Sequence, residues 1–134
     1  MIGWLWWIPF GRVDEIAPGE LAERLAEPTP EAGSVAVRRP QILDVRTRAE
    51  YRRGHIPGAV NLPVQELAQG LEQLGLEPSR PVVAVCLSAH RSVPAVRLLQ
   101  RRGFDDAVQL QGGMMAWRRA RLALVTETAS SDPP

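Results

Sequence analysis

The amino-acid sequence predicts an α/β fold, in which a mostly parallel sheet is covered by helices on both faces. Two observations lead to this prediction. Short apolar runs rich in Val, Ile and Leu, such as residues 81–85, have the length and composition of buried strands. Longer segments such as residues 92–102 carry apolar residues three or four positions apart and predict helices between these runs. Strands that alternate with helices along a chain are typical of a parallel sheet.

The remaining elements follow from the same patterns and from Pro and Gly. The first helix is expected at residues 16–26, because Pro18 suits a first helical turn and Leu21 and Leu25 share a face. Residues 27–40 contain three Pro and a Gly and predict a loop with a weak strand at 35–37. The other expected strands are 41–45, 60–62, 81–85 and 107–110, and the other expected helices are 48–53, 64–74, 92–102 and 114–121.

Length and composition indicate one globular domain. A chain of 134 residues with 45% hydrophobic residues can bury a core without disulfides or metal. The net charge of +1 argues against a nucleic-acid partner. The single Cys cannot form an internal disulfide, and no Cys/His cluster has metal-ligand spacing. We therefore expect no metal, no cofactor and a reducing, cytoplasmic location.

The two ends of the chain differ from the centre. Residues 1–10 hold three of the four Trp, are too short to span a bilayer and lack the pattern of a signal peptide. We expect residues 1–12 to form an arm. Its residues 1–10 are expected to pack on the domain, on a partner or on a second copy, to adsorb weakly to a membrane surface, or to extend freely from the domain. The domain is expected at 13–122, followed by a tail at 123–134 that is disordered at its polar, Pro-containing end.

The chemistry-bearing residues are expected at one edge of the sheet. Cys86 directly follows the strand at 81–85, on a loop that ends where Ser92 begins a helix. Ligands bind at the carboxyl ends of strands in open α/β sheets, and loop N–H groups with a helix dipole favour a thiolate there. Asp44 and Arg46 follow another strand and are expected at the same edge. From position alone, Cys86 is equally well explained as a small buried hydrophobic residue.

Three stretches together resemble a rhodanese domain over residues 13–122. They are Asp44-Val45-Arg46 with Glu50-Tyr51 and Gly54-His55-Ile56-Pro57-Gly58-Ala59; Val85-Cys86-Leu87-Ser88-Ala89-His90-Arg91-Ser92; and Gly112-Gly113-Met114-Met115-Ala116-Trp117. The resemblance implies a five-stranded sheet and a sulfurtransferase in which Cys86 carries sulfane sulfur as a persulfide. The implied partners are a small-molecule sulfur donor such as thiosulfate and an acceptor that is cyanide, a thiol or a protein thiol.

The loop length favours sulfur transfer within this resemblance. Cys86 to Arg91 is six residues, as in sulfurtransferase rhodaneses, whereas the related cell-cycle phosphatases and some arsenate reductases have one residue more. Two positions depart from the family pattern. Ala89 stands where many members have Gly, so that the loop could take a different turn, and Leu87 stands where thiosulfate-using members are often basic.

The resemblance and the positions of the residues together imply a role for each residue of the site. Cys86 is expected to be the nucleophile, and the loop residues Leu87, Ser88, Ala89, His90, Arg91 and Ser92 are expected to bind substrate or to shape the loop. Arg91 is expected to hold the loop backbone or to pair with a carboxylate such as Asp44. Asp44, Arg46 and Glu50 are expected to form a supporting ion-pair network, His55 to anchor a turn, and Trp117 with Met114 to lie in the core.

Two other functions compete with sulfur transfer. One is a non-catalytic binding or regulatory module that keeps the fold for docking, which the presence of both Cys86 and Arg91 disfavours. The other is a phosphatase or arsenate reductase, which the six-residue loop disfavours.

Overall fold

The computed structural model describes residues 13–27 and 39–127, which build one five-stranded sheet flanked by helices. All neighbouring strands are parallel, in the order β1-β5-β4-β2-β3, so β4 is the central strand. The strands are β1 (Glu15–Ile16), β2 (Gln41–Asp44), β3 (Val60–Asn61), β4 (Val82–Val85) and β5 (Ala107–Leu110). The predicted α/β class with a parallel sheet is confirmed.

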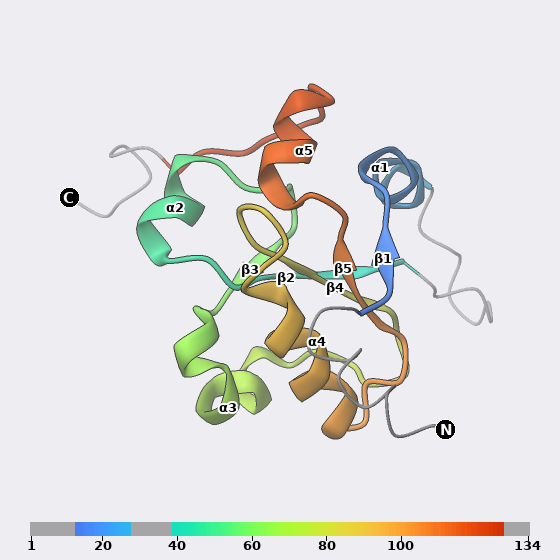
Figure 1. The fold of residues 1–134 in the computed structure, drawn as a ribbon, viewed down its shortest axis with the longest axis vertical. Helices are drawn as coiled ribbons and strands as arrows, with labels where there is room; N and C mark the ends of the chain where they lie inside the picture. The colour runs from blue at the N-terminus through green and yellow to red at the C-terminus, as the bar shows by residue number, and fades with distance from the viewer. Residues whose placement is uncertain (1–12, 28–38, 128–134) are drawn as a thin grey trace, which may run out of the picture.

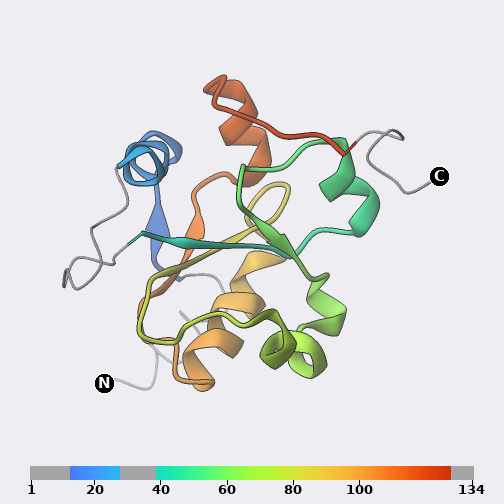
Figure 2. The same cartoon turned by 180° about the vertical axis from the view of Figure 1, so that it is seen from behind.

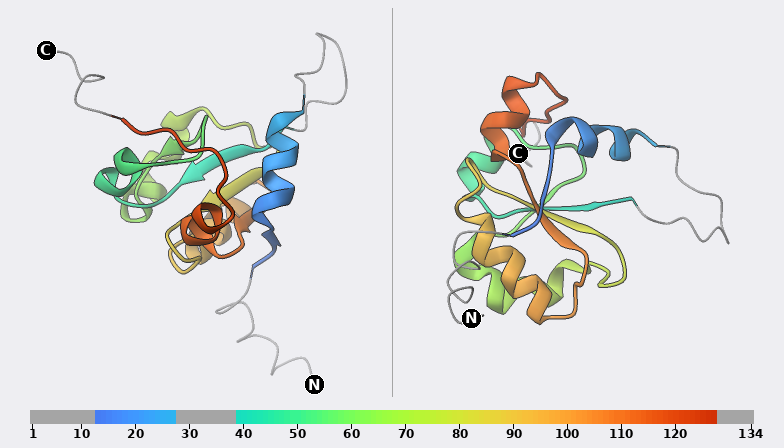
Figure 3. Two further views of the ribbon diagram at one scale, coloured as in Figure 1. Left: turned by 90° about the horizontal axis from the view of Figure 1, so that it is seen from above. Right: turned by 45° about the vertical axis from the view of Figure 1, so that its right-hand side comes forward.

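The helices are short and lie between the strands along the chain. They are α1 (Pro18–Ala26), α2 (Arg48–Arg53), α3 (Leu67–Gly70), α4 (Ser92–Arg101) and α5 (Gly113–Arg119), with 3₁₀ turns at Val64–Glu66 and Leu71–Leu74 on either side of α3. Figures 1 and 2 show α1 and α5 on one side of the sheet and α3 and α4 on the other. The right-hand view of Figure 3 shows the same two helical layers with the twisted strands between them.

Each face of the sheet has its own apolar cluster. On the α1 and α5 side, Val83 and Val85 of the central strand pack with Leu21, Met114 and Trp117. On the other side, the packed residues come from the alternate positions of the strands and from α3 and α4: Leu43, Val82, Ala84, Leu67, Ala95, Val96 and Leu99. Burial on both faces explains why the central strand, β4, is continuously apolar. Met114 and Trp117 lie in the core, as predicted.

The beginning of the chain differs from the prediction. The first helix begins at Pro18, and Ile16 instead belongs to β1, where it pairs with Leu110. Ala17 precedes a proline and has extended backbone angles (φ −70°, ψ 149°), so the helix cannot extend back through it. The expected strand at 35–37 and the arm at 1–12 lie outside the described residues.

One further helix differs from the prediction. The single helix expected at 64–74 is instead α3 with a 3₁₀ turn at each end. In the segment expected to be the C-terminal tail, Trp117 Nε1 donates to the Ala123 carbonyl at 2.9 Å and the backbones of His55 and Val125 exchange two hydrogen bonds of 2.9 Å. Residues 123–127 are therefore held against the domain, whereas 128–134 lie outside the described residues.

Candidate active site

Cys86 lies directly after β4, at the carboxyl end of the central strand. Its side chain is 1% exposed, and the loop that follows leads straight into α4. Figures 1 and 2 show this loop between α5 and α4. Among the residues that the structure describes, none accepts a hydrogen bond from the backbone N–H groups of Leu87, Ser88, Ala89 or His90. These donors remain available to an anion, such as a thiolate or a persulfide.

The beginning of α5 holds the first two carbonyl groups of the loop. The Met114 N–H donates to the Cys86 carbonyl at 2.8 Å, and the Met115 N–H donates to the Leu87 carbonyl at 2.9 Å. This contact requires Gly113, because a Cβ atom there would lie 2.5 Å from the Cys86 carbonyl oxygen. Sequence reasoning placed Gly113 in a family motif, and the structure shows that its missing side chain lets α5 contact the loop.

The loop keeps a left-handed turn at Ala89. Its φ is 73°, a value that glycine adopts without steric cost and alanine does not. Ala89 therefore adopts a positive φ, the backbone conformation that favours glycine, and does so at a steric cost. Leu87, Ser88 and His90 are exposed, and His90 Nδ1 lies 3.2 Å from the Ser88 carbonyl oxygen.

Arg91 closes the loop by pairing with Glu50 of α2. The two side chains form a bidentate ion pair with N–O distances of 2.8 and 3.0 Å. The hydrogen bond from Arg91 is the main cause that lowers the pKa of Glu50 to about 2. Hydrogen bonds from Thr47 lower this pKa further, whereas burial of the carboxylate raises it. The same pair raises the pKa of Arg91. Arg91 thus pairs with a carboxylate, but the partner is Glu50 and not Asp44.

Asp44 and Arg46 form a separate, fully buried pair. Arg46 Nη2 donates to Asp44 Oδ2 at 2.7 Å and to the Gly54 carbonyl at 2.8 Å, and both side chains are 1–2% exposed. Asn61, which sequence reasoning missed, donates to the Asp44 and Arg46 carbonyls at 2.8 and 2.9 Å. The expected network of Asp44, Arg46 and Glu50 is therefore two ion pairs, of which only the Glu50 pair reaches the Cys86 loop.

His55 anchors the turn beside this buried pair. Its ring stacks on Tyr51 at 3.7 Å between centroids, and its Nδ1 lies 2.8 Å from the Tyr51 carbonyl oxygen. Because a carbonyl can only accept, Nδ1 carries the hydrogen. His55 thus has the structural position expected from the sequence.

A line of polar side chains starts at the cysteine sulfur. Cys86 Sγ lies 3.4 Å from Ser92 Oγ, which donates to Gln109 Oε1 at 2.6 Å. Gln109 Nε2 in turn donates to Glu15 Oε2 at 2.7 Å. Sequence reasoning missed Gln109 and Glu15. A polar side chain in the otherwise apolar strand 107–110 was a usable signal for Gln109, whereas nothing in the sequence marks Glu15.

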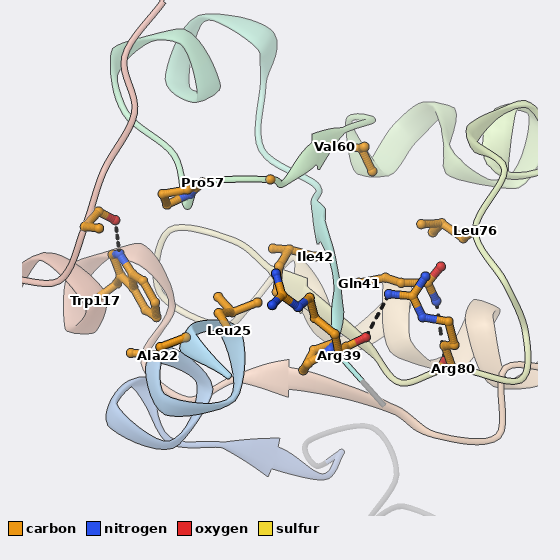
Figure 4. Close-up of a pocket in the computed structure, with 14 residues that line it drawn as sticks. Ala22, Leu25, Arg39, Gln41, Ile42, Pro57, Val60, Leu76, Arg80 and Trp117 are labelled. Carbon is orange, nitrogen blue, oxygen red and sulfur yellow. Dashed lines mark hydrogen bonds between the residues drawn. The ribbon is translucent and has the colours of Figure 1, made fainter. Parts of the chain in front are cut away.

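A cavity of about 660 Å³ lies away from the cysteine loop. Figure 4 shows Trp117 and Leu25 at one end and Arg80 and Leu76 at the other. No residue from Cys86 to Ser92 lines it, so the chemistry of Cys86 does not use this cavity.

The described part of the chain offers neither a metal-ligand cluster nor a membrane-spanning helix. Residues 13–27 and 39–127 contain no group of three or more His, Cys, Asp or Glu arranged to hold a metal ion. Within the same residues, no helix has both the length and the apolar character needed to cross a bilayer.

Comparison with known proteins gives a consistent relationship. A family model described as "Rhodanese-like domain" matches residues 18–120. Over 80 residues, 60% of this chain and 77% of the relative, the sequence is 40% identical to the thiosulfate sulfurtransferase GlpE of Shewanella oneidensis. Over 111 residues it is 39% identical to the HTH-type transcriptional regulator Rv0324 of Mycobacterium tuberculosis, where the match takes in 81% of this chain but 43% of the regulator.

A solved structure shows the same architecture. The rhodanese-related protein of Thermoplasma volcanium superimposes with a TM-score of 0.69 and 25% identity, over 84% of this chain and 98% of that protein. The cysteine loop at the end of the central strand, the family match over most of the domain and this shared fold all point the same way. The chain belongs to the rhodanese-like domain family.

Proposed function

We propose that this protein transfers sulfane sulfur through a persulfide on Cys86, with thiosulfate or a related sulfur compound as the donor. The observation that carries the proposal is the shape of the loop. Cys86 is followed by backbone N–H groups with no acceptor among the described residues, and α5 and Arg91 hold the two ends of the loop. Similarity to a thiosulfate sulfurtransferase supports this choice of chemistry.

The first step loads sulfur onto the enzyme. The Cys86 thiolate attacks the outer sulfur of thiosulfate, and a new S–S bond forms while the S–S bond of the donor breaks. The electron pair of the broken bond leaves with sulfite. Three negative charges enter the step, one on the thiolate and two on thiosulfate, and three leave it, one on the persulfide and two on sulfite. Preorganised N–H groups stabilise the anionic sulfur in both states.

The second step discharges the persulfide. An acceptor such as cyanide or a thiolate attacks the terminal sulfur, and the electron pair of the Cys86 S–S bond returns to Cys86 as a thiolate. Because Cys86 is the only cysteine of the 134 residues, no second thiol of this chain can take the sulfur. The acceptor is therefore a separate molecule, and the kinetics are of the ping-pong type.

Intact-protein mass spectrometry tests the proposal directly. After incubation with thiosulfate, we expect the wild-type protein to gain the mass of one sulfur atom, and cyanide to remove it with formation of thiocyanate. Cys86→Ser is the matched control and gains nothing. No gain with thiosulfate, mercaptopyruvate or a persulfide donor would contradict the proposal.

A second candidate is a binding or regulatory module. It is supported by the similarity to a transcriptional regulator that is more than twice as long as the matched region. A protein that fails to load sulfur from any donor, yet forms a stable complex with a partner that survives Cys86→Ser, would favour this second function.

A further inference from the structure

The polar line behind Cys86 is built into the face of the sheet that α4 covers. Ser92 is the first residue of α4 and is fully buried, and Gln109 of β5 is 4% exposed. Glu15 of β1 is exposed and stands directly opposite Gln109 in the parallel register of the two strands. The edge strand thus connects solvent to the cysteine sulfur through two buried side chains.

The direction of each hydrogen bond in this line follows from counting donors. An ionised Glu15 carboxylate only accepts, so the Gln109 amide must present its Nε2 to Glu15 at 2.7 Å. The amide oxygen of Gln109 therefore faces Ser92, at 2.6 Å. A hydroxyl group has one hydrogen, and Ser92 gives it to Gln109. Ser92 Oγ therefore presents a lone pair to Cys86 Sγ, which lies 3.4 Å away.

We propose that Gln109 and Glu15 are positioning residues that fix the Ser92 hydroxyl as a hydrogen-bond acceptor from the Cys86 thiol. The Cys86 S–H group can then donate to Ser92. In the uncharged enzyme that carries no extra sulfur, each donor of the line therefore has an acceptor. In the thiolate, and equally in the persulfide, Cys86 Sγ carries no hydrogen and meets the Ser92 lone pair instead. The functional meaning of this arrangement rests on the proposed function, in which Cys86 alternates between these states.

This arrangement favours the discharged enzyme over the loaded one. When an acceptor removes the terminal sulfur, Cys86 is left as a thiolate. It then takes one proton from solvent and regains its hydrogen bond to Ser92. Loading requires the reverse change, in which that hydrogen bond is lost. The Glu15–Gln109–Ser92 line therefore promotes release of sulfur to the acceptor and limits the amount of thiolate in the resting protein.

Titration of the thiolate by its ultraviolet absorbance tests the proposal in the folded protein. Cys86 is the only cysteine, and subtracting the spectrum of Cys86→Ser removes the contribution of tyrosine. In Gln109→Leu the Ser92 hydrogen has lost its acceptor and can turn to the sulfur. We expect about tenfold more thiolate at a fixed pH below the midpoint, the effect of one hydrogen bond to a charged acceptor. Glu15→Gln, which leaves every buried residue in place, is expected to act in the same direction because the Gln109 amide can then reverse.

The same two changes in a Ser92→Ala background separate the proposed line from other effects. Loss of the Glu15 charge favours a thiolate by simple electrostatics whether or not Ser92 is present, whereas the proposed effect passes through Ser92 and should disappear without it. Glu20→Gln, at an exposed position in the first turn of α1, is the matched charge control and should leave the profile unchanged.

The outcomes are distinct. An unchanged profile in Glu15→Gln, or an increase in thiolate that persists undiminished in Ser92→Ala, overturns the proposal. An increase that requires Ser92 supports it. The titration involves no sulfur donor, so its outcome is independent of the proposed function. If the protein shows the increase that requires Ser92 but never gains sulfur in the mass measurement, the hydrogen-bonded line is supported and the proposed function is contradicted.

Discussion

Single residues determine much of the geometry of the cysteine loop, and one of them, Ala89, has a strained backbone. Its φ of 73° places a Cβ atom in the left-handed region, which costs an L-residue roughly 1–2 kcal/mol. The loop keeps this turn because both of its ends are held, by α5 at Cys86 and Leu87 and by Glu50 at Arg91. The strain is therefore maintained by contacts elsewhere, which is common at functional loops.

Ala89→Gly relieves this strain. We expect the free energy of unfolding to rise by about 0.5 kcal/mol, since the relief exceeds the greater chain entropy that glycine has when unfolded. Urea unfolding midpoints measure the change. Ala68→Gly, at an exposed helical position of α3, is the control and should lower the midpoint. A drop of equal size in both variants would contradict the strain at Ala89.

At the scale of elements, the contact between α5 and the Cys86 loop depends on the absence of one side chain. Gly113 has a φ of 61°, and a Cβ atom there would lie within 2.6 Å of three backbone atoms of Cys86 and Leu87. Since those atoms are backbone, they can move aside only if the loop itself moves. The motif at residues 112–117 thus positions the loop of the motif at residues 85–92, although the two are separate along the chain.

Gly113→Ala is expected to move the loop away from α5. Because it adds both backbone strain and a clash, we expect a loss of more than about 2 kcal/mol in the free energy of unfolding and loss of sulfur loading on Cys86. Gly75→Ala is the matched control, because Gly75 has a similar φ of 72° but nothing within 4 Å of its added Cβ. It should cost about 1 kcal/mol and leave loading intact. Equal loading in the two variants would show that the α5 contact is dispensable.

Some elements of this fold can be predicted from the sequence, and others cannot. Strands at 41–45, 81–85 and 107–110 were predictable because burial on both faces makes them apolar runs bounded by turn residues. β1 was not, because two residues are too few for a periodic pattern and only their pairing with β5 makes them a strand. The partner of Arg91 was missed for a similar reason, since Glu50 lies 41 residues away and any of several carboxylates would have suited the pattern.

For the whole molecule, folding brings α2 and the cysteine loop together through one ion pair. Glu50 caps α2 through the Thr47 backbone N–H at 2.9 Å and also pairs with Arg91 at 2.8 and 3.0 Å. One carboxylate therefore stabilises a helix N-terminus and fixes the end of the loop that carries Cys86. Because its pKa falls from 4.5 to about 2 on folding, the stability of the protein is linked to pH through this group.

The direction of that link is fixed by the lowered pKa. In the unfolded chain Glu50 takes up its proton as the pH falls through 4.5, whereas in the folded protein it stays ionised down to a pH of about 2. The stabilisation is therefore complete above the unfolded pKa and is lost as the pH falls from about 4.5 toward 2. Glu50→Gln removes the charge but preserves a capping-box residue, so it isolates the ion pair from the helix cap.

We expect Glu50→Gln to lower the free energy of unfolding at pH 7 by about 1 kcal/mol, a value reduced for the partial exposure of the pair. The difference from wild type should shrink steadily below pH 4.5 and vanish near pH 2, where the wild-type carboxylate is also becoming protonated. Urea unfolding across this pH range measures it. Glu66→Gln breaks the Arg48–Glu66 pair, whose side chains are 56% and 48% exposed, and should change stability little at any pH. A Glu50→Gln effect that is the same at pH 3 and pH 7 would mean that Glu50 acts through packing, and that the link between α2 and the Cys86 loop is not electrostatic.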